Sequence, residues 1–194
     1  MLISKNHLRA RHAVSKDDTR PVLCSIDVSR DGDAVVAVAT DGYKLIEVRE
    51  PTPSEADFPD VNAGSPVEHI RVSGPTAAKL KAAMKPNKYV PVLNYGHATD
   101  EGVVTTDLAK TVVFKDAEPD GNFPDYKKLV PEAAGARATV LLDPDLLASV
   151  LKAFEGTREV VLEIHPDKLA PVVIRTTDDD VEITGVVMPL KGRS

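Results

Sequence analysis

Ala39-Thr40-Asp41-Gly42-Tyr43-Lys44-Leu45 is the stretch of the sequence that best indicates the fold. An Asp-Gly pair stands between two apolar runs, and glycine tolerates the positive φ that a tight hairpin turn requires. The stretch therefore predicts a β-hairpin with its turn at Asp41-Gly42. A second pair, Asp31-Gly32, lies shortly before it. We expect three successive antiparallel strands, at residues 21–28, 33–39 and 43–48.

A helix with basic side chains precedes these strands, at about residues 5–15. The order of basic helix and short apolar strands then recurs twice, which indicates three repeated β-α-β-β units of one type. In the second unit a strand at 69–72 leads into a helix that Ser73-Gly74-Pro75 opens, because proline suits the first helical position. The strands predicted after this helix are 89–95, 102–106 and 111–114.

The third unit begins with a predicted strand at 138–142, and Asp143 caps the following helix. Leu147, Val150, Leu151 and Phe154 fall at i, i+3, i+4 and i+7, the spacing of a helix face directed at a core. The strands predicted after this helix are 159–164, 172–176, 181–183 and 186–188.

Two such units side by side make a two-layer α+β domain, with the helices on one face and the sheets on the other. We expect this domain at residues 1–118, from units 1–50 and 67–118. A linker at 119–135 and a half-domain at 136–194 follow. The third unit has no partner within the chain. It could complete a domain with its twin across a two-fold axis, so self-association is expected.

Composition sets broad limits on the protein. Aromatic residues are only 4% of the 194 residues and tryptophan is absent, so the core must be aliphatic. The single Cys24 lies in an apolar run and is expected to be a buried thiol in a reducing compartment. The N-terminus lacks the apolar region of a signal peptide, and no apolar stretch approaches the roughly 20 residues of a membrane span. We expect a soluble, cytoplasmic protein.

No arrangement of residues indicates catalysis. The five histidines are scattered without the spacing of a metal site, and one cysteine cannot build a zinc finger. The glycine-rich loops that bind nucleotide phosphates are absent from the sequence. Asp178-Asp179-Asp180 has the composition of a cation site, but a solvated hairpin turn explains it more simply. We therefore predict no enzymatic activity, no cofactor and no metal.

Basic residues gather in the helical segments although the formal net charge is -6. One interpretation is that these are ordinary solvated helix faces. The other is a surface that meets DNA phosphates, where each contact adds a sequence-independent, salt-dependent increment. Aromatic residues do not interleave with these lysines, which argues against stacking on single-stranded bases. The candidate DNA-binding residues are Arg9, Arg11, Lys79, Lys81, Lys85 and Lys152.

Three stretches in this order resemble the bacterial sliding clamp, the beta subunit of DNA polymerase III. They are the stretch at 39–45, Asp120-Gly121-Asn122-Phe123-Pro124-Asp125-Tyr126-Lys127-Lys128-Leu129-Val130-Pro131, and Val186-Val187-Met188-Pro189-Leu190. They are similar, in turn, to a signature of the clamp's middle domain, the linker after that domain, and the terminal strand. The resemblance runs from residue 18 to the C-terminus with gaps. It implies a shortened form of a protein that is a ring around duplex DNA.

The resemblance also implies a groove for the linear peptides of polymerases and other clamp-binding proteins. Aliphatic and methionine side chains suit its apolar anchors. The alternative is that residues 40–42 form only a turn and 186–190 only a core strand. The residues at matching positions are Leu23, Thr40, Gly42, Tyr43, Lys44, Leu45, Pro124, Lys128, Leu129, Val172, Val186, Met188, Pro189 and Leu190.

Two interpretations of function remain from the sequence. In the first, the protein is a DNA replication or repair factor that confers processivity or docks partners, encircles or lies on duplex DNA, and forms a homo-oligomer. In the second, it is an adaptor or decoy that binds clamp-type peptides and never encircles DNA. An unrelated α+β enzyme is a third and weaker possibility.

Overall fold

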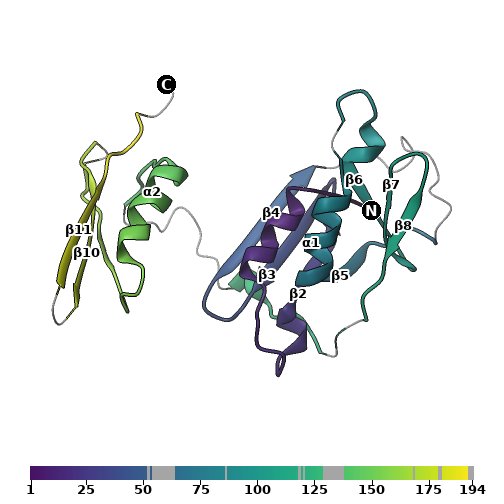
Figure 1. Ribbon diagram of the computed structural model, residues 1–194, viewed down its shortest axis with the longest axis horizontal. Coiled ribbons are helices and arrows are strands. Elements are labelled where there is room, and N and C mark those ends of the chain that lie inside the picture. The colour runs from purple at the N-terminus through teal and green to yellow at the C-terminus, as the bar shows by residue number, and fades with distance from the viewer. Residues whose placement is uncertain are drawn as a thin grey trace. The chain divides into compact units, whose positions relative to one another are not determined.

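The computed structural model describes residues 1–51, 53, 64–85, 87–117, 119, 121–128, 138–167, 169–178 and 181–191. The chain divides into two compact units, Met1–Pro124 and Asp125–Ser194 (Figure 1). The division falls inside the segment predicted as a linker, residues 119–135. Within the described part of the chain, no helix is long and apolar enough to cross a membrane.

Two four-stranded antiparallel sheets build the first unit, and each contains strands of both repeats (Figure 1). The first sheet has the order β4-β3-β2-β5 and the second β1-β6-β7-β8. The strands of the first sheet are β4 (Leu45–Pro51), β3 (Ala34–Thr40), β2 (Ser25–Asp31) and β5 (His69–Ser73). Those of the second are β1 (Leu2–Ser4), β6 (Tyr95–Thr99), β7 (Gly102–Thr106) and β8 (Thr111–Phe114).

The two repeats of the first unit exchange their first strands. β1 precedes the first helix but pairs with β6 of the second repeat, with Ser4 opposite Tyr95. β5 precedes the second helix but pairs with β2 of the first repeat, with Ser73 opposite Ser25. One edge strand of each sheet therefore comes from the other repeat.

Two helices lie side by side over the sheet that contains β2–β5 (Figure 1). They are η1, a 3-10 helix at His7–Ala13, and α1, an α-helix at Gly74–Ala83. Alanines such as Ala10 and Ala77 are fully buried where the helices meet the core, and Leu8 and Leu80 complete the packing. The prediction of an α+β fold with both helices on one face is confirmed.

In the described part of the second unit, the helix α2 and the short η7 after it pack on a three-stranded sheet of order β11-β10-β9. Gly185 allows the close approach of this helix, because a Cβ atom there would lie 2.5 Å from Val150 Cγ1. Phe154, Ile174 and Val187 are buried between the layers. The elements are α2 (Pro144–Leu151), η7 (Lys152–Phe154), β9 (Val161–Glu163), β10 (Val172–Asp178) and β11 (Val181–Val187).

Several predicted elements differ from those found. Pro21–Cys24 and Pro91–Asn94 form the short 3-10 helices η2 and η4 rather than the beginnings of strands. Both read Pro-Val-Leu followed by a polar residue or cysteine, and a proline lacks the N–H that a strand ladder needs. The predicted strand at 138–142 has no ladder partner among the described residues, and the two predicted strands at 181–183 and 186–188 are one strand, β11. The sequence analysis missed β1.

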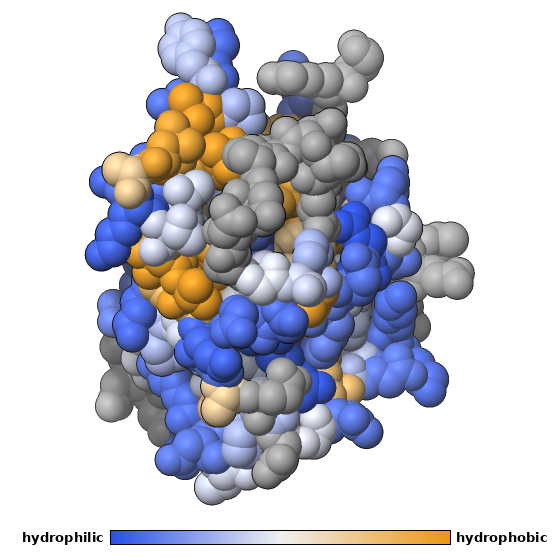
Figure 2. Space-filling model, turned by 90° about the vertical axis from the view of Figure 1, so that its right-hand side faces the viewer, coloured by the Kyte–Doolittle hydropathy of each residue, from blue (hydrophilic) through white to orange (hydrophobic). Residues whose placement is uncertain are grey.

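Outer strands carry exposed apolar side chains. β8 ends the second sheet, and Val112 and Val113 on it are exposed. Figure 2 shows the side of the molecule on which β7 and β8 lie in Figure 1, and hydrophobic residues form patches there among hydrophilic ones. The edge of this sheet therefore offers some apolar surface without being uniformly hydrophobic.

A buried histidine connects β1 to the first sheet. The backbone N–H of Ser4 donates to His7 Nδ1 at 2.9 Å, and His7 Nε2 lies 3.0 Å from the Val35 carbonyl oxygen. Nδ1 thus accepts and Nε2 carries the proton, which is the neutral imidazole. Burial lowers the pKa of His7 below its ordinary value. The folded protein therefore resists protonation of this side chain.

This pKa shift predicts acid sensitivity. Below about pH 6.5 the unfolded chain takes up a proton at His7 that the folded chain does not, so the free energy of unfolding should fall as the pH falls. Above that pH the histidine should contribute no pH dependence. Urea unfolding at several pH values in this range should show that His7→Gln is less stable. In this variant the free energy of unfolding should also depend less steeply on pH, by an amount equivalent to at most about one bound proton. His12→Gln, at an exposed position, is the control, and an unchanged slope in His7→Gln would contradict the assignment.

Candidate peptide groove and nucleic-acid interface

The turn between β3 and β4 is fixed by its own side chains. Asp41 Oδ1 accepts hydrogen bonds from the backbone N–H groups of Tyr43 at 2.9 Å and Lys44 at 3.0 Å. The Thr40 hydroxyl donates to the Lys44 carbonyl at 2.7 Å and accepts from the Gly42 N–H at 3.1 Å. Gly42 has a φ of 94°, which favours glycine. The backbone donors hold the pKa of the Asp41 carboxyl below its usual range.

Because the turn satisfies its own polar groups, its outer side chains remain available. Tyr43 is 96% exposed, so the first unit leaves its ring uncovered. Leu45 is half-buried at the start of β4. The Lys44 ammonium lies 3.5 Å from the Asp41 carboxylate and is more than half exposed. This arrangement presents an aromatic ring, an aliphatic side chain and a cation within three consecutive residues.

An open hollow of about 540 Å³ lies beside this turn. Its other wall is the segment that joins η1 to η2, where Arg20 Nε pairs with Asp17 at 3.4 Å. Hydrogen bonds from Thr19 lower the pKa of the Asp17 carboxyl. The groove candidate Leu23 is only 6% exposed and does not line this hollow. The residues around the hollow are Val14, Ser15, Lys16, Asp17, Arg20, Asp41, Tyr43 and Lys44.

An arginine holds the start of the linker to the first unit. Arg71 on β5 donates through Nη1 to the carbonyl oxygens of Pro119 and Gly121, at 3.1 and 2.9 Å. Its Nε lies 3.2 Å from Asp27 on the neighbouring strand β2. Pro124, which ends this stretch, is exposed. The anchored linker therefore presents Pro124 at the edge of the first unit.

The remaining groove candidates lie in the second unit. Lys128 Nζ is 2.8 Å from Asp125, which raises the pKa of this lysine, and Leu129 lies outside the described residues. Val186, Met188 and Leu190 are 51%, 58% and 46% exposed, and Pro189 between the last two is half-buried. The alternation with buried Val187 turns Val186 and Met188 to the outer face of the sheet. They therefore form an exposed apolar stripe.

One candidate lies on the wrong face of that sheet. Val172 stands opposite Val187 in the ladder, and both are buried against α2. Val173 stands opposite Val186 and is half-buried. The structure therefore assigns Val172 to the core, and Val173 is the residue of β10 that shares the face of the stripe. The run of apolar residues at 172–174 gives no alternation from which the sequence analysis could have chosen between them.

The basic candidates of the first unit lie on two adjacent helices. Arg9 on η1 and Lys79 and Lys81 on α1 are exposed, as is Lys85 just after α1. Arg11 is half-buried, and its Nη1 donates to the Leu8 carbonyl at 3.3 Å. Packing of η1 against α1 brings these charges from residues far apart in the sequence to one helical layer. The sixth candidate, Lys152, is exposed on η7 of the second unit.

Metal binding and thiol chemistry would each need a specific arrangement among the described residues. No group of three His, Cys, Asp or Glu side chains there could hold a metal ion. Burial raises the pKa of the half-buried Cys24 thiol, which disfavours a reactive thiolate.

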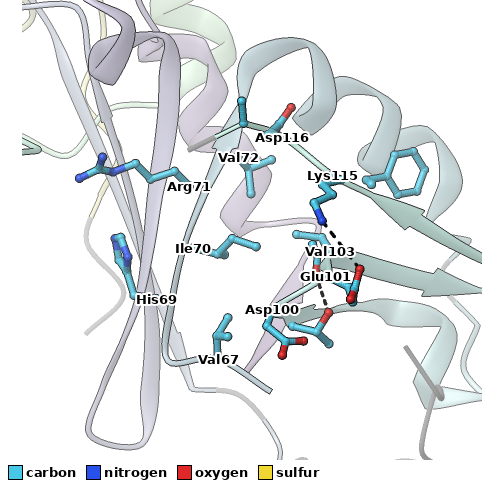
Figure 3. A pocket seen from close by; sticks show the side chains of 14 residues that line it. Val67, His69, Ile70, Arg71, Val72, Asp100, Glu101, Val103, Lys115 and Asp116 are labelled. Carbon is cyan, nitrogen blue, oxygen red and sulfur yellow. Dashed lines mark hydrogen bonds and ion pairs between the residues drawn. The ribbon is translucent and has the colours of Figure 1, made fainter. Parts of the chain in front are cut away.

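A cavity of about 440 Å³ lies between β5 of the first sheet and two parts of the second sheet, the turn from β6 to β7 and the end of β8 (Figure 3). Its charged groups are already paired. Lys115 lies 3.8 Å from Glu101, and the Asp116 carboxylate accepts hydrogen bonds from Ser73 N–H and Thr76 Oγ1, both at 2.7 Å. The Asp116 hydrogen bonds connect the segment after β8 to the beginning of α1. The cavity is therefore part of the junction between the repeats.

The comparisons with known proteins agree with this architecture. No protein-family model matches the sequence, and the search of curated proteins gives no match. Among solved structures, the DNA polymerase sliding clamp from Bacillus subtilis matches with a TM-score of 0.64 at 17% identity, over 97% of this chain and 48% of the clamp. The chain has the sliding-clamp fold.

Two further clamps give similar values. The sliding clamp from Caulobacter crescentus matches with a TM-score of 0.62 at 20% identity, over 97% of this chain and 50% of the clamp. The DNA polymerase III subunit beta from Pseudomonas aeruginosa matches with a TM-score of 0.65 at 18% identity, over 99% and 52%. The chain thus spans about half the length of these clamps, and the resemblance to the beta subunit is confirmed at the level of fold.

The turn geometry gives a test of local order. Asp41→Ala removes the acceptor of two backbone N–H groups, so amide hydrogen exchange at Tyr43 and Lys44 should become several-fold faster. Asp41→Asn keeps an Oδ1 acceptor and should retain most of the protection. Exchange at β7 amides serves as the internal control. Equal protection in the alanine variant and the native chain would show that Asp41 does not order the turn.

Proposed function

We propose that this protein is a sliding-clamp-like factor of DNA replication or repair that docks linear peptides and contacts duplex DNA through its helices. The observation that carries the proposal is the self-stabilised β3–β4 turn with Tyr43, Lys44 and Leu45 presented outward on a sliding-clamp fold. Its role is processivity or docking without chemistry of its own, and it acts in the cytoplasm.

The surfaces suit a peptide with apolar anchors. Tyr43 and Leu45 supply apolar area beside a cation in the first unit, and Val186, Met188 and Leu190 supply an apolar stripe in the second. A few exposed aromatic and methionine side chains commonly dominate the binding of such segments. We infer that each of these two surfaces suits the same class of ligand, a short linear motif of a polymerase or another clamp-binding protein.

The stripe can be tested with one truncation. Met188→Ala should weaken binding of a labelled clamp-binding peptide by roughly 1–3 kcal/mol, since an anchor surface loses area and packing. Thr184→Ala, also exposed on β11, is the matched control and should bind as the native chain does. If the native chain shows no saturable binding at high micromolar peptide, the peptide site is wrong even though the fold stands.

The basic layer of η1 and α1 supports weak, sequence-independent binding to duplex DNA. Arg9, Lys79, Lys81 and Lys85 are exposed on or just after two helices that pack together, and Lys152 offers a further cation in the second unit. Contacts of this kind neutralise phosphates without reading bases. The helical layer is therefore the part of the molecule that would face DNA.

Charge removal tests this interface. Arg9→Gln, Lys79→Gln and Lys85→Gln together should weaken binding equally on different duplex sequences. The same change should flatten the slope of log affinity against log salt by about 0.9 for each phosphate that is no longer neutralised. A control that removes three lysines elsewhere, at Lys110, Lys115 and Lys127, has the same net charge. DNA binding that responds equally to both triple variants would argue against the helical surface.

An adaptor or decoy that binds clamp-type peptides without encircling DNA is the second candidate function. The formal net charge of -6 favours it, because an acidic chain is less suited to surrounding DNA. The family's clamps suggest a homo-oligomer, and retention on nicked circular DNA separates the two functions because only a closed assembly is retained. An adaptor would bind the peptide and leave the circular DNA free.

A further inference from the structure

The second unit can be aligned with the second repeat of the first unit at the residue that caps its helix. Ser73 caps α1 by accepting from the Thr76 N–H at 3.2 Å, and Asp143 caps α2 by accepting from the N–H groups of Asp145 and Leu146. Aligning the two caps places residues 139–143 on β5, residues 69–73. Val140 and Leu142 pack against the core of their unit, as Ile70 and Val72 do in theirs. Segment 139–143 is therefore the counterpart of the exchanged strand β5.

In the second unit, the strand that should pair with such a segment is an edge strand among the described residues. β2 and β6 each lie inside a four-stranded sheet, flanked by the first strand of the other repeat. β9 holds the same position in the second unit but ends its sheet. Val161 and Leu162 on β9 are 59% and 48% exposed. An apolar edge strand without a neighbour is a template for pairing with another chain.

The same unit cannot close this edge with its own segment. The Leu190 N–H, just after β11, donates to the Leu141 carbonyl at 2.8 Å. β11 and β9 are at opposite ends of the sheet. The 139–143 segment thus contacts the end of the sheet away from β9, which leaves β9 accessible to the equivalent segment of a second molecule.

The helix side of the unit is open as well. Thr76 on α1 is 8% exposed, whereas Leu146, three residues after the cap at the matching position of α2, is 50% exposed. In the first unit η1 packs beside α1. In the described part of the second unit no helix packs beside α2 in this way. An apolar edge and an apolar helix flank are thus exposed in one unit.

We propose that a second copy of this chain completes the half-domain by reciprocal strand exchange, with segment 139–143 of each copy added to β9 of the other. The donor segment and the acceptor edge are both present in the unit, so one two-fold axis satisfies both at once. The template is the first unit, where two repeats close their sheets in this way. This inference is independent of the peptide and DNA functions proposed above.

The first unit also predicts the register of the exchange. Ile174 on β10 matches Ala37 on β3, because each is the middle of three alternating buried positions, residues 172, 174 and 176 on β10 and residues 35, 37 and 39 on β3. The residues opposite them are Leu162 and Val28, and Val28 faces Ile70 on β5. Leu162 should therefore lie opposite Val140 of the partner copy, and Val161 opposite Leu141.

Disulfide trapping tests this register. Leu141→Cys and Val161→Cys together, in a Cys24→Ser background, should give a covalent dimer under mild oxidation, because cross-strand neighbours have Cα separations that a disulfide accepts. Each single variant should stay uncrosslinked alone, and a mixture of the two singles should crosslink. Leu141→Cys with Thr184→Cys is the mismatched control. A disulfide within one chain, or equal dimer yield from the mismatched pair, would overturn the proposal.

A second measurement protects against a failure of the cysteine variants to fold. Light scattering of the native chain at tens of micromolar should show a dimer. Val161→Lys should raise the dimer dissociation constant several-fold, because the cross-strand contact of Val161 with Leu141 of the other copy is lost at each of two edges. Val186→Lys, an equal change on the outer face of β11, should leave it unchanged. A folded native monomer, or a dimer indifferent to Val161→Lys, would refute strand exchange.

Discussion

The exchange of first strands between repeats is the constraint on which the rest of the first unit depends. β1 and β5 each leave their own repeat to close the sheet of the other, so neither repeat has a complete sheet alone. The exchange draws both helices into one core, where Leu8 of η1 and Leu80 of α1 pack together. The basic helical layer is therefore a consequence of sheet closure, since η1 and α1 would otherwise belong to separate structures.

The β3–β4 turn shows how an aromatic side chain is held in an exposed position by a locally stabilised backbone. Hydrogen bonds within residues 40–44 hold this turn. The Asp41 carboxylate accepts from backbone N–H groups, and the Thr40 hydroxyl donates to a backbone carbonyl. Tyr43 then needs no contact with the rest of the unit and can remain 96% exposed. A turn that depended on Tyr43 for its own stability would have to release those contacts whenever a ligand bound the ring.

Local features of the fold could be predicted from the sequence more accurately than contacts between residues far apart in the chain. Tight turns and helix starts depend on neighbouring residues, so β7, β8 and the start of α1 at Ser73-Gly74-Pro75 were predicted where they are found. β1 has three residues, too few to show an alternation, and its pairing with β6 is a long-range contact. The same limit affects the groove candidates. The exposed face of β11 could be inferred from Val186 and Met188, but the placement of Val172 depends on ladder register and helix packing.

Net charge is a poor guide to what a phosphate would meet on this protein. Many of its carboxylates serve backbone N–H groups at turns and caps: Asp41 and Asp107 in hairpin turns, Asp143 at α2 and Asp116 at Ser73. The lysines and arginines of η1 and α1 lie instead on exposed helix surface. Since exposed charges are screened beyond about 8–10 Å at physiological salt, a ligand at the helices experiences the nearby cations more than the sum over the chain. A chain with an overall charge of -6 can therefore present a cationic helical layer.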